Sequence, residues 1–135
     1  MDYNDILSLI KMEMRTVVGF LLIFTTTATT VPASPQIESY GVPENRINNI
    51  LDLNQSYFEG VNRIEFIWSN PDYRSTDGFY YPYSNKIIIY VYEWSDSYYR
   101  SILKHELLHH YCWYVKKEIN LDHRGCFLNS SKTMK

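Results

Sequence analysis

The sequence predicts an α+β domain in which a small mixed sheet packs on an N-terminal scaffold helix and on a second, C-terminal helix. Hydrophobic residues make up 45% of the 135 residues and charged residues 21%, a composition typical of a globular chain with one core. Apolar residues have helical spacing around positions 44–58 and 103–115, and runs with strand character lie between these segments. No internal repeat is visible. We therefore expect one domain over residues 34–135.

Residues 1–33 have the pattern of a leader segment. An apolar run, residues 17–24, follows Arg15 and precedes a short stretch ending at Ala33, where a small residue suits cleavage. The run is too short to span a bilayer, for which about 20 residues are needed. We expect a signal peptide or an N-terminal hydrophobic segment here, and hence a secreted protein or one attached to a membrane through residues 17–31. The alternative is a cytoplasmic protein whose N-terminal segment belongs to the fold.

The scaffold helix is expected over residues 44–58. Pro43 suits the start of a helix, and Gly60 suits its end. The apolar residues Ile47, Ile50, Leu51 and Phe58 share one face of this helix. That face would pack against the sheet.

Three strands are expected after the scaffold helix. Residues 63–69 alternate in hydrophobicity, which predicts a strand with one face better buried than the other. Residues 79–83 form a short aromatic strand, and Pro82 places it at a sheet edge or ends it there, because proline cannot donate to a ladder. Residues 86–94 contain the strongest strand signal, the run from Ile87 to Tyr92.

The C-terminal helix, residues 103–115, carries the motif H-E-x-x-H. His105 and His109 are four residues apart, so both can direct a ring nitrogen at one metal ion from the same face of a helix. Glu106 is turned about 100° from His105 and can act as general base on a water whose pKa the metal lowers. Ser95 is among the candidate caps upstream. Two ligands and a base in this spacing predict a zinc-dependent peptidase site; the alternative is an amphipathic helix that contains the motif by chance.

The same helix has an apolar side. One continuous arc of its wheel contains Leu107, Leu108, Tyr111, Tyr114, Val115 and Ile119. The arc predicts that this side of the helix is buried against the sheet. The two histidines would then line a cleft at its boundary.

Catalytic zinc normally has three protein ligands, so a third must come from downstream. Glu118 lies nine residues after His109, and a continuous helix would turn it about 180° away from the metal. Asn120 suits the end of the helix, which places Asp122 and His123 on a returning segment. We expect His123 to be the ligand because three histidines are a common catalytic set. Asp122 is the alternative ligand, or else a partner that orients the His123 ring.

The motif together with His123 and Phe127, in H-x-x-x-F spacing, resembles the SprT-like and Wss1-like zincin metallopeptidases. Members of that group have an H-G-x-x-F segment, whereas the glycine here, Gly125, stands two residues after the histidine. The resemblance covers residues 86–127 and implies a minimal zincin-like fold, a bound Zn²⁺ ion and peptidase activity. It also implies that the strand from Ile87 to Tyr92 is the sheet edge that pairs with an extended peptide or protein substrate.

Two alternatives to this function remain open. The chain could be a structural or interaction protein that binds zinc without turnover, although zinc binding alone does not require the carboxylate of Glu106. It could also be an intracellular SprT-like protease whose first 30 residues are part of the fold. The formal net charge of −2 gives no electrostatic footprint for nucleic acid, so we expect no nucleic-acid partner.

The two cysteines of the chain follow the expected ligands at the same distance. Cys112 is three residues after His109, and Cys126 is three residues after His123. On the helix Cys112 falls next to His105 and His109, so a returning His123 would bring Cys126 close to Cys112. We expect a Cys112–Cys126 disulfide, which fits an exported protein. The alternative is two free cysteines.

Overall fold

The computed structural model describes residues 33–118 and 122–131. Its internal contacts divide the chain into Met1–Val31 and Pro32–Lys135, two residues before the boundary that we expected. The described residues all belong to the second unit. The leader segment expected over residues 1–33 lies outside them, apart from its last residue. None of the helices in the described ranges is long and apolar enough to cross a membrane.

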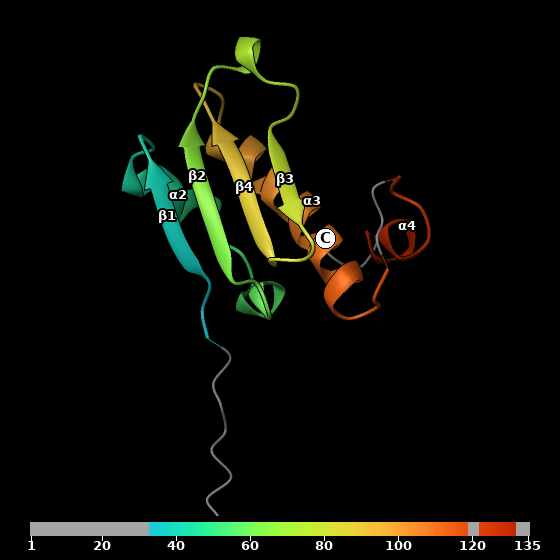
Figure 1. The fold of residues 1–135 in the computed structure, drawn as a ribbon. Helices are drawn as coiled ribbons and strands as arrows, with labels where there is room; N and C mark the ends of the chain where they lie inside the picture. Colours follow the sequence, from blue (N-terminus) through green and yellow to red (C-terminus); the bar gives the residue numbers. More distant parts are fainter. Residues whose placement is uncertain (1–32, 119–121, 132–135) are drawn as a thin grey trace, which may run out of the picture. The chain divides into compact units, whose positions relative to one another are not determined.

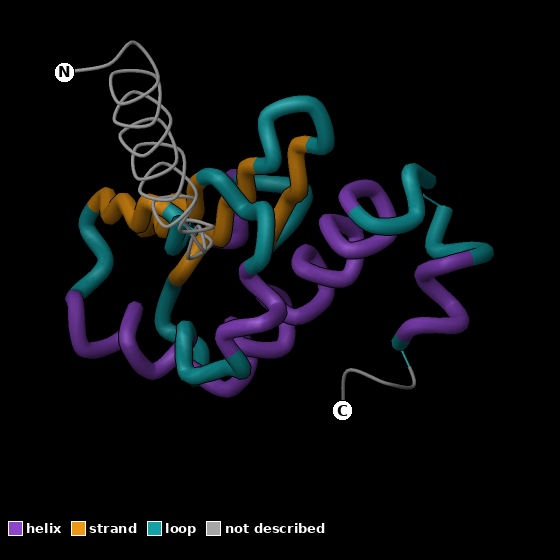
Figure 2. Tube along the Cα trace, turned by 90° about the horizontal axis from the view of Figure 1, so that it is seen from below, coloured by secondary structure: helices purple, strands orange, loops and turns teal. Residues whose placement is uncertain are grey.

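The described chain is an α+β fold with one mixed sheet. Its helices and strands are β1 (Gln36–Tyr40), α2 (Glu44–Ile50), β2 (Arg63–Trp68), β3 (Gly78–Tyr81), β4 (Lys86–Val91), α3 (Asp96–Tyr114) and α4 (Cys126–Ser130). The four strands lie in the order β1-β2-β4-β3, with β1, β2 and β4 parallel and β3 antiparallel to β4 (Figure 1). Helices α2 and α3 lie on one face of this sheet (Figure 2).

Apolar side chains fill the space between the sheet and the helices. This core includes Ile47 and Ile50 of α2, Ile64 and Phe66 of β2, Ile87, Ile89 and Val91 of β4, and Tyr99, Leu103 and Leu107 of α3. In β2 and β4 the core residues alternate along the strand, so one face of the sheet is turned to the helices. This packing fixes α3 under β3 and β4, and with it the segment that carries H-E-x-x-H.

The scaffold helix is shorter than the sequence predicts. Helix α2 ends at Ile50, and a separate 3-10 helix, Gln55–Phe58, follows it. The interruption has a local cause, because the Asn54 side chain accepts a hydrogen bond from the Ser56 backbone N–H, 3.0 Å away, and caps the new turn. Phe58 still reaches the core, as the apolar pattern predicts.

The order of the strands corrects one prediction and confirms another. The expected substrate-binding edge, from Ile87 to Tyr92, is wrong: β4 pairs with β2 on one side and β3 on the other, so its backbone has no free edge. The short aromatic strand is at the edge, as Pro82 predicts, and it ends at Tyr81. The free edge that a peptide could join next to α3 therefore belongs to β3.

Candidate metal centre

Helix α3 carries the motif and begins at Asp96, directly after Ser95, one of the candidate caps. The Ser95 hydroxyl caps it by accepting from the Tyr98 backbone N–H at 3.3 Å. The predicted apolar arc is buried only in part: Leu107 and Leu108 are buried, whereas Tyr111, Tyr114 and Val115 are exposed. The side that faces the core is centred on Tyr99, Leu103 and Leu107, and Glu106 is buried beside them. Glu106 is thus enclosed between its helix and the sheet.

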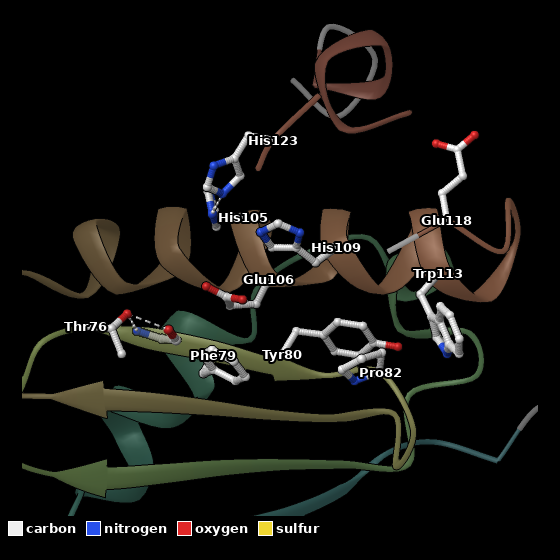
Figure 3. Close-up of a pocket in the computed structure, with 11 residues that line it drawn as sticks. Thr76, Phe79, Tyr80, Pro82, His105, Glu106, His109, Trp113, Glu118 and His123 are labelled. Atoms are coloured by element: carbon white, nitrogen blue, oxygen red, sulfur yellow. Dashed lines mark hydrogen bonds between the residues drawn. The ribbon is translucent and has the colours of Figure 1, made fainter. Parts of the chain in front are cut away.

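Three histidine rings meet above α3 (Figure 3). The ring nitrogens available from His105, His109 and His123 all lie within 4.8 Å of one another. The Nε2 atoms of His105 and His123 are 3.0 Å apart, close to the roughly 3.3 Å that separates two nitrogen ligands on a tetrahedral zinc ion. Burial, and then the neighbouring His123, lower the pKa of His105, which favours the neutral ring that binds metal. The donor set therefore fits one metal ion.

The alternative ligand, Asp122, does not join this group. Its carboxylate accepts from the Arg124 backbone N–H at 3.3 Å and forms an ion pair with the Arg124 guanidinium at 3.6 Å. His110 is not part of the group either. Its ring nitrogens contact the Tyr80 hydroxyl at 3.2 Å and the Glu59 carbonyl at 2.7 Å.

Glu106 lies beside the histidines in the same pocket, which has a volume of about 200 Å³. Only 7% of its surface is exposed. Burial raises the pKa of the Glu106 carboxyl to about 7, and a hydrogen bond from the Tyr80 backbone acts in the opposite direction. Its carboxyl group lies between the histidines and β3 (Figure 3). A group with this pKa can accept and release a proton near neutral pH.

Strand β3 forms the opposite wall of the pocket, and its outer edge pairs with no other strand of the described residues. The Tyr90 N–H donates to the Asp77 carbonyl at 2.9 Å, so this opposed pair is hydrogen-bonded. Hydrogen-bonded and non-bonded pairs alternate along an antiparallel ladder, so Gly78 and Tyr80 direct their backbone groups away from β4. Near this edge the Thr76 hydroxyl donates to the Gly78 carbonyl at 2.7 Å.

At Gly78, strand β3 packs tightly against α3. A Cβ atom at this position would lie 2.6 Å from Cγ2 of Ile102 and 3.2 Å from Cγ and Oε1 of Glu106. Any larger residue would therefore push the strand away from the general-base candidate. The sequence contained a signal for this residue, the Asp77-Gly78 pair before an aromatic strand, but that signal predicts only a turn.

Replacing Gly78 with alanine is expected to lower the free energy of unfolding by about 1–3 kcal/mol, because the new methyl group overpacks the contact between β3 and α3. Chemical denaturation of the two proteins measures this loss. The double variant Gly78→Ala/Ile102→Ala removes the obstructing methyl group, so the cost of Gly78→Ala should be smaller in the Ile102→Ala background. Equal costs in both backgrounds would contradict the steric explanation.

The third histidine is held by a segment that returns to α3. The helix ends at Tyr114 instead of continuing toward Asn120, which itself lies outside the described residues. Lys117 adopts a left-handed backbone with φ 57°, and the Glu118 N–H donates to the Cys112 carbonyl at 3.0 Å. His123 also has a positive φ, 58°, which is uncommon outside glycine and requires support from its surroundings.

That support comes from two residues that follow His123. The structure contains the expected Cys112–Cys126 disulfide, with a Cα–Cα distance of 5.7 Å, which ties the returning segment to α3. The Phe127 ring packs on all three histidines, with centroid distances of 4.9 Å to His105, 4.5 Å to His109 and 4.7 Å to His123. The resemblance included Phe127, and the structure places its ring against the three histidines.

The double variant Cys112→Ser/Cys126→Ser is expected to lose about 3 kcal/mol of stability, the entropic effect of opening a loop of this length. Its zinc affinity should fall about tenfold as well, because His123 is then less firmly positioned. Denaturation and zinc titration against a competing chelator measure the two effects. A reductant should not change the variant further, and equal zinc affinities of the variant and the oxidised native chain would refute this positioning role.

Comparison of the chain with known protein families, curated proteins and solved structures finds no match.

Proposed function

We propose that this chain is a zinc-dependent peptidase. The observation that supports this function best is the pocket in which three histidines, a buried carboxyl group and a free strand edge meet. His105, His109 and His123 would hold the metal, and Glu106 would act as the general base. A site that only stored zinc would require neither the carboxyl group nor the strand edge.

Zinc is the metal that this donor set suits. Three neutral imidazoles are a common ligand set of catalytic zinc and leave a coordination position for water or substrate. When bound, zinc supplies a Lewis acid that polarises a carbonyl group and makes water more acidic. The protein contributes the orientation of the three rings, through α3 for two of them and through the disulfide-linked segment for the third.

Glu106 would perform both proton transfers. It removes a proton from the attacking water as the oxygen bonds to the scissile carbonyl carbon, and it then delivers that proton to the departing amine nitrogen as the C–N bond breaks. A pKa of about 7, raised by burial, suits a group that must act as base and then as acid. The enclosed position between α3 and β3 keeps the carboxyl group close to the histidines.

The substrate would be a peptide or an unfolded protein segment bound as an added strand. The outward backbone groups of Gly78 and Tyr80 are the positions to which such a strand would hydrogen-bond. The substrate strand would replace the present bonds of the Tyr80 N–H to Glu106 and of the Gly78 N–H to the Thr76 hydroxyl. The Thr76 hydroxyl would leave the Gly78 carbonyl as the peptide arrives. In this proposal β3 has the role that the family resemblance implied for the strand from Ile87 to Tyr92.

The proposed location is an oxidising compartment outside the cytoplasm. The Cys112–Cys126 disulfide supports this location, because disulfides persist in exported proteins and are rare in the cytoplasm.

Removal and return of the metal test the function directly. The purified chain should contain one zinc ion and should cleave an unfolded protein substrate. Dialysis against a chelator should abolish cleavage, and stoichiometric zinc should restore it. Elemental analysis and a fluorescence-based cleavage assay measure the two quantities. A chain that binds zinc but cleaves nothing would contradict the proposed function and favour a binding protein.

A further inference from the structure

Strand β3 carries two exposed aromatic side chains that the proposed chemistry does not use. Burial alternates along the strand, so that Gly78 and Tyr80 are buried toward α3, whereas Phe79 and Tyr81 lie on the opposite face of the sheet. Phe79 is 42% exposed and Tyr81 39%, and the centroids of their rings are 4.8 Å apart. The two rings form a short aromatic stripe at the edge of the sheet.

The two edge strands of the sheet differ in charge. The outer strand on the other side, β1, contains Glu38, which forms an ion pair with Arg63 at 3.4 Å. The strand β3 consists of Gly-Phe-Tyr-Tyr and contains no charged residue. Natural sheets commonly protect an edge from further strands with charged side chains. The absence of charge from β3 therefore suits an edge that accepts a strand, as the proposed function requires.

The ladder between β3 and β4 determines which peptide side chains would reach the aromatic stripe. An antiparallel added strand would form hydrogen-bonded pairs with Gly78 and Tyr80, because their backbone groups point away from β4. Phe79 and Tyr81 would then be in non-hydrogen-bonded pairs, with Cα atoms about 4.5 Å apart and side chains at their closest. Two peptide side chains, two positions apart, would lie against these rings. The side chain between them would point toward α3.

The chemistry of the stripe favours apolar side chains of a particular kind. Aromatic rings pair well across strands with β-branched and aromatic side chains. The Lys86 ammonium lies 4.9 Å from the centroid of the Tyr81 ring, so a lysine or arginine of the peptide would meet a like charge there. Segments with β-branched and aromatic residues at alternate positions form the half-buried strands of folded proteins. Such segments become accessible when a protein unfolds.

We infer that Phe79 and Tyr81 form a subsite that selects peptide segments with β-branched or aromatic residues at alternate positions. This inference rests on the proposed peptidase function and names its substrate class, unfolded segments that would form strands in a folded protein. Phe79 and Tyr81 are then specificity residues, separate from the histidines and from Glu106.

The test measures binding, so that it does not depend on turnover. The zinc-loaded Glu106→Gln chain is titrated with two fluorescent seven-residue peptides of the same composition, in which two isoleucines among serines are either two positions apart or adjacent. Adding Phe79→Ala/Tyr81→Ala should weaken binding of the alternating peptide about tenfold, because both of its isoleucines lose an aromatic partner. The adjacent peptide should lose only about threefold, since one of its isoleucines points toward α3.

The matched control adds Tyr40→Ala to the Glu106→Gln chain. Tyr40 is 53% exposed on β1, at the other edge of the sheet, so this change should leave the affinity for both peptides unaltered. Equal losses for the two peptides in the Phe79→Ala/Tyr81→Ala chain would overturn the subsite, because a general disturbance of β3 would weaken both alike. No loss, or no measurable binding of either peptide before these substitutions, would overturn it as well.

The outcomes separate this inference from the proposed function. If the two losses differ as expected but the native zinc-loaded chain cleaves neither the peptides nor an unfolded protein, the peptidase proposal fails and the subsite stands as a peptide-binding site. If the native chain cleaves unfolded protein while the two losses are equal, the subsite fails and the peptidase proposal stands.

Discussion

Glu106→Gln is expected to lower the rate of peptide hydrolysis by about 10³-fold while the protein keeps its zinc. Glutamine has nearly the same size and shape but cannot take a proton from water or pass one to the departing amine. The buried carboxyl group, with its pKa raised to about 7, is the group in the described pocket that is suited to this transfer. Steady-state kinetics with a fluorogenic peptide and elemental analysis on the same sample provide both readouts.

Glu65 offers a matched control for this substitution. It is a second buried glutamate, 8% exposed, but it lies on β2, forms ion pairs with Arg63 and Lys86 and does not line the pocket. Glu65→Gln should therefore leave kcat near that of the native chain. A Glu106→Gln chain that retains zinc and hydrolyses peptide at the native rate would eliminate Glu106 as the general base.

The motif helix could be predicted from the sequence because its determinants are local. The four-residue spacing of His105 and His109 fixes their relation on any helix, and Ser95 supplies the cap that the structure uses. The buried side of this helix could be predicted only in part. The wheel predicted an arc from Leu107 to Tyr111, but the side that faces the core extends from Leu107 in the other direction, to Leu103 and Glu106. Contacts with strands far away in the sequence determine this side.

The parts that could not be predicted depend on contacts between distant segments. β1 has mostly exposed side chains, so it lacks the alternation that marks a strand, and it exists because its backbone pairs with β2. Likewise, β3 pairs with β4 at the edge of the sheet, and the sequence of neither strand specifies this pairing. Helix α3 ends at Tyr114, and the chain then turns back so that Cys126 can bond to Cys112. These two cysteines are fourteen residues apart in the sequence. The five residues of α4 are too few for a helical pattern to emerge.

The third histidine of the site is an example of a residue that the sequence only narrows to two candidates, His123 and Asp122. Both residues lie on the returning segment, and spacing alone permits either as a ligand. The structure groups His123 with the other histidines and pairs Asp122 with Arg124. His123 has a positive φ, an uncommon backbone conformation that its surroundings must stabilise. The Cys126 disulfide and the Phe127 ring supply that stabilisation and hold the His123 ring in place.

His123→Ala is accordingly expected to weaken zinc binding by about 10²–10³-fold, since structural zinc sites bind with about 10–16 kcal/mol and each ligand contributes roughly 3 kcal/mol of this. Asp122→Ala, one position away on the same segment, should bind zinc as the native chain does. Zinc titration against a competing chelator compares the three proteins. His123→Asn separates ligation from backbone conformation, because asparagine tolerates a positive φ but provides no imidazole. Its affinity should fall as far as that of His123→Ala. A larger loss in Asp122→Ala than in either His123 variant would reassign the third ligand to the carboxylate.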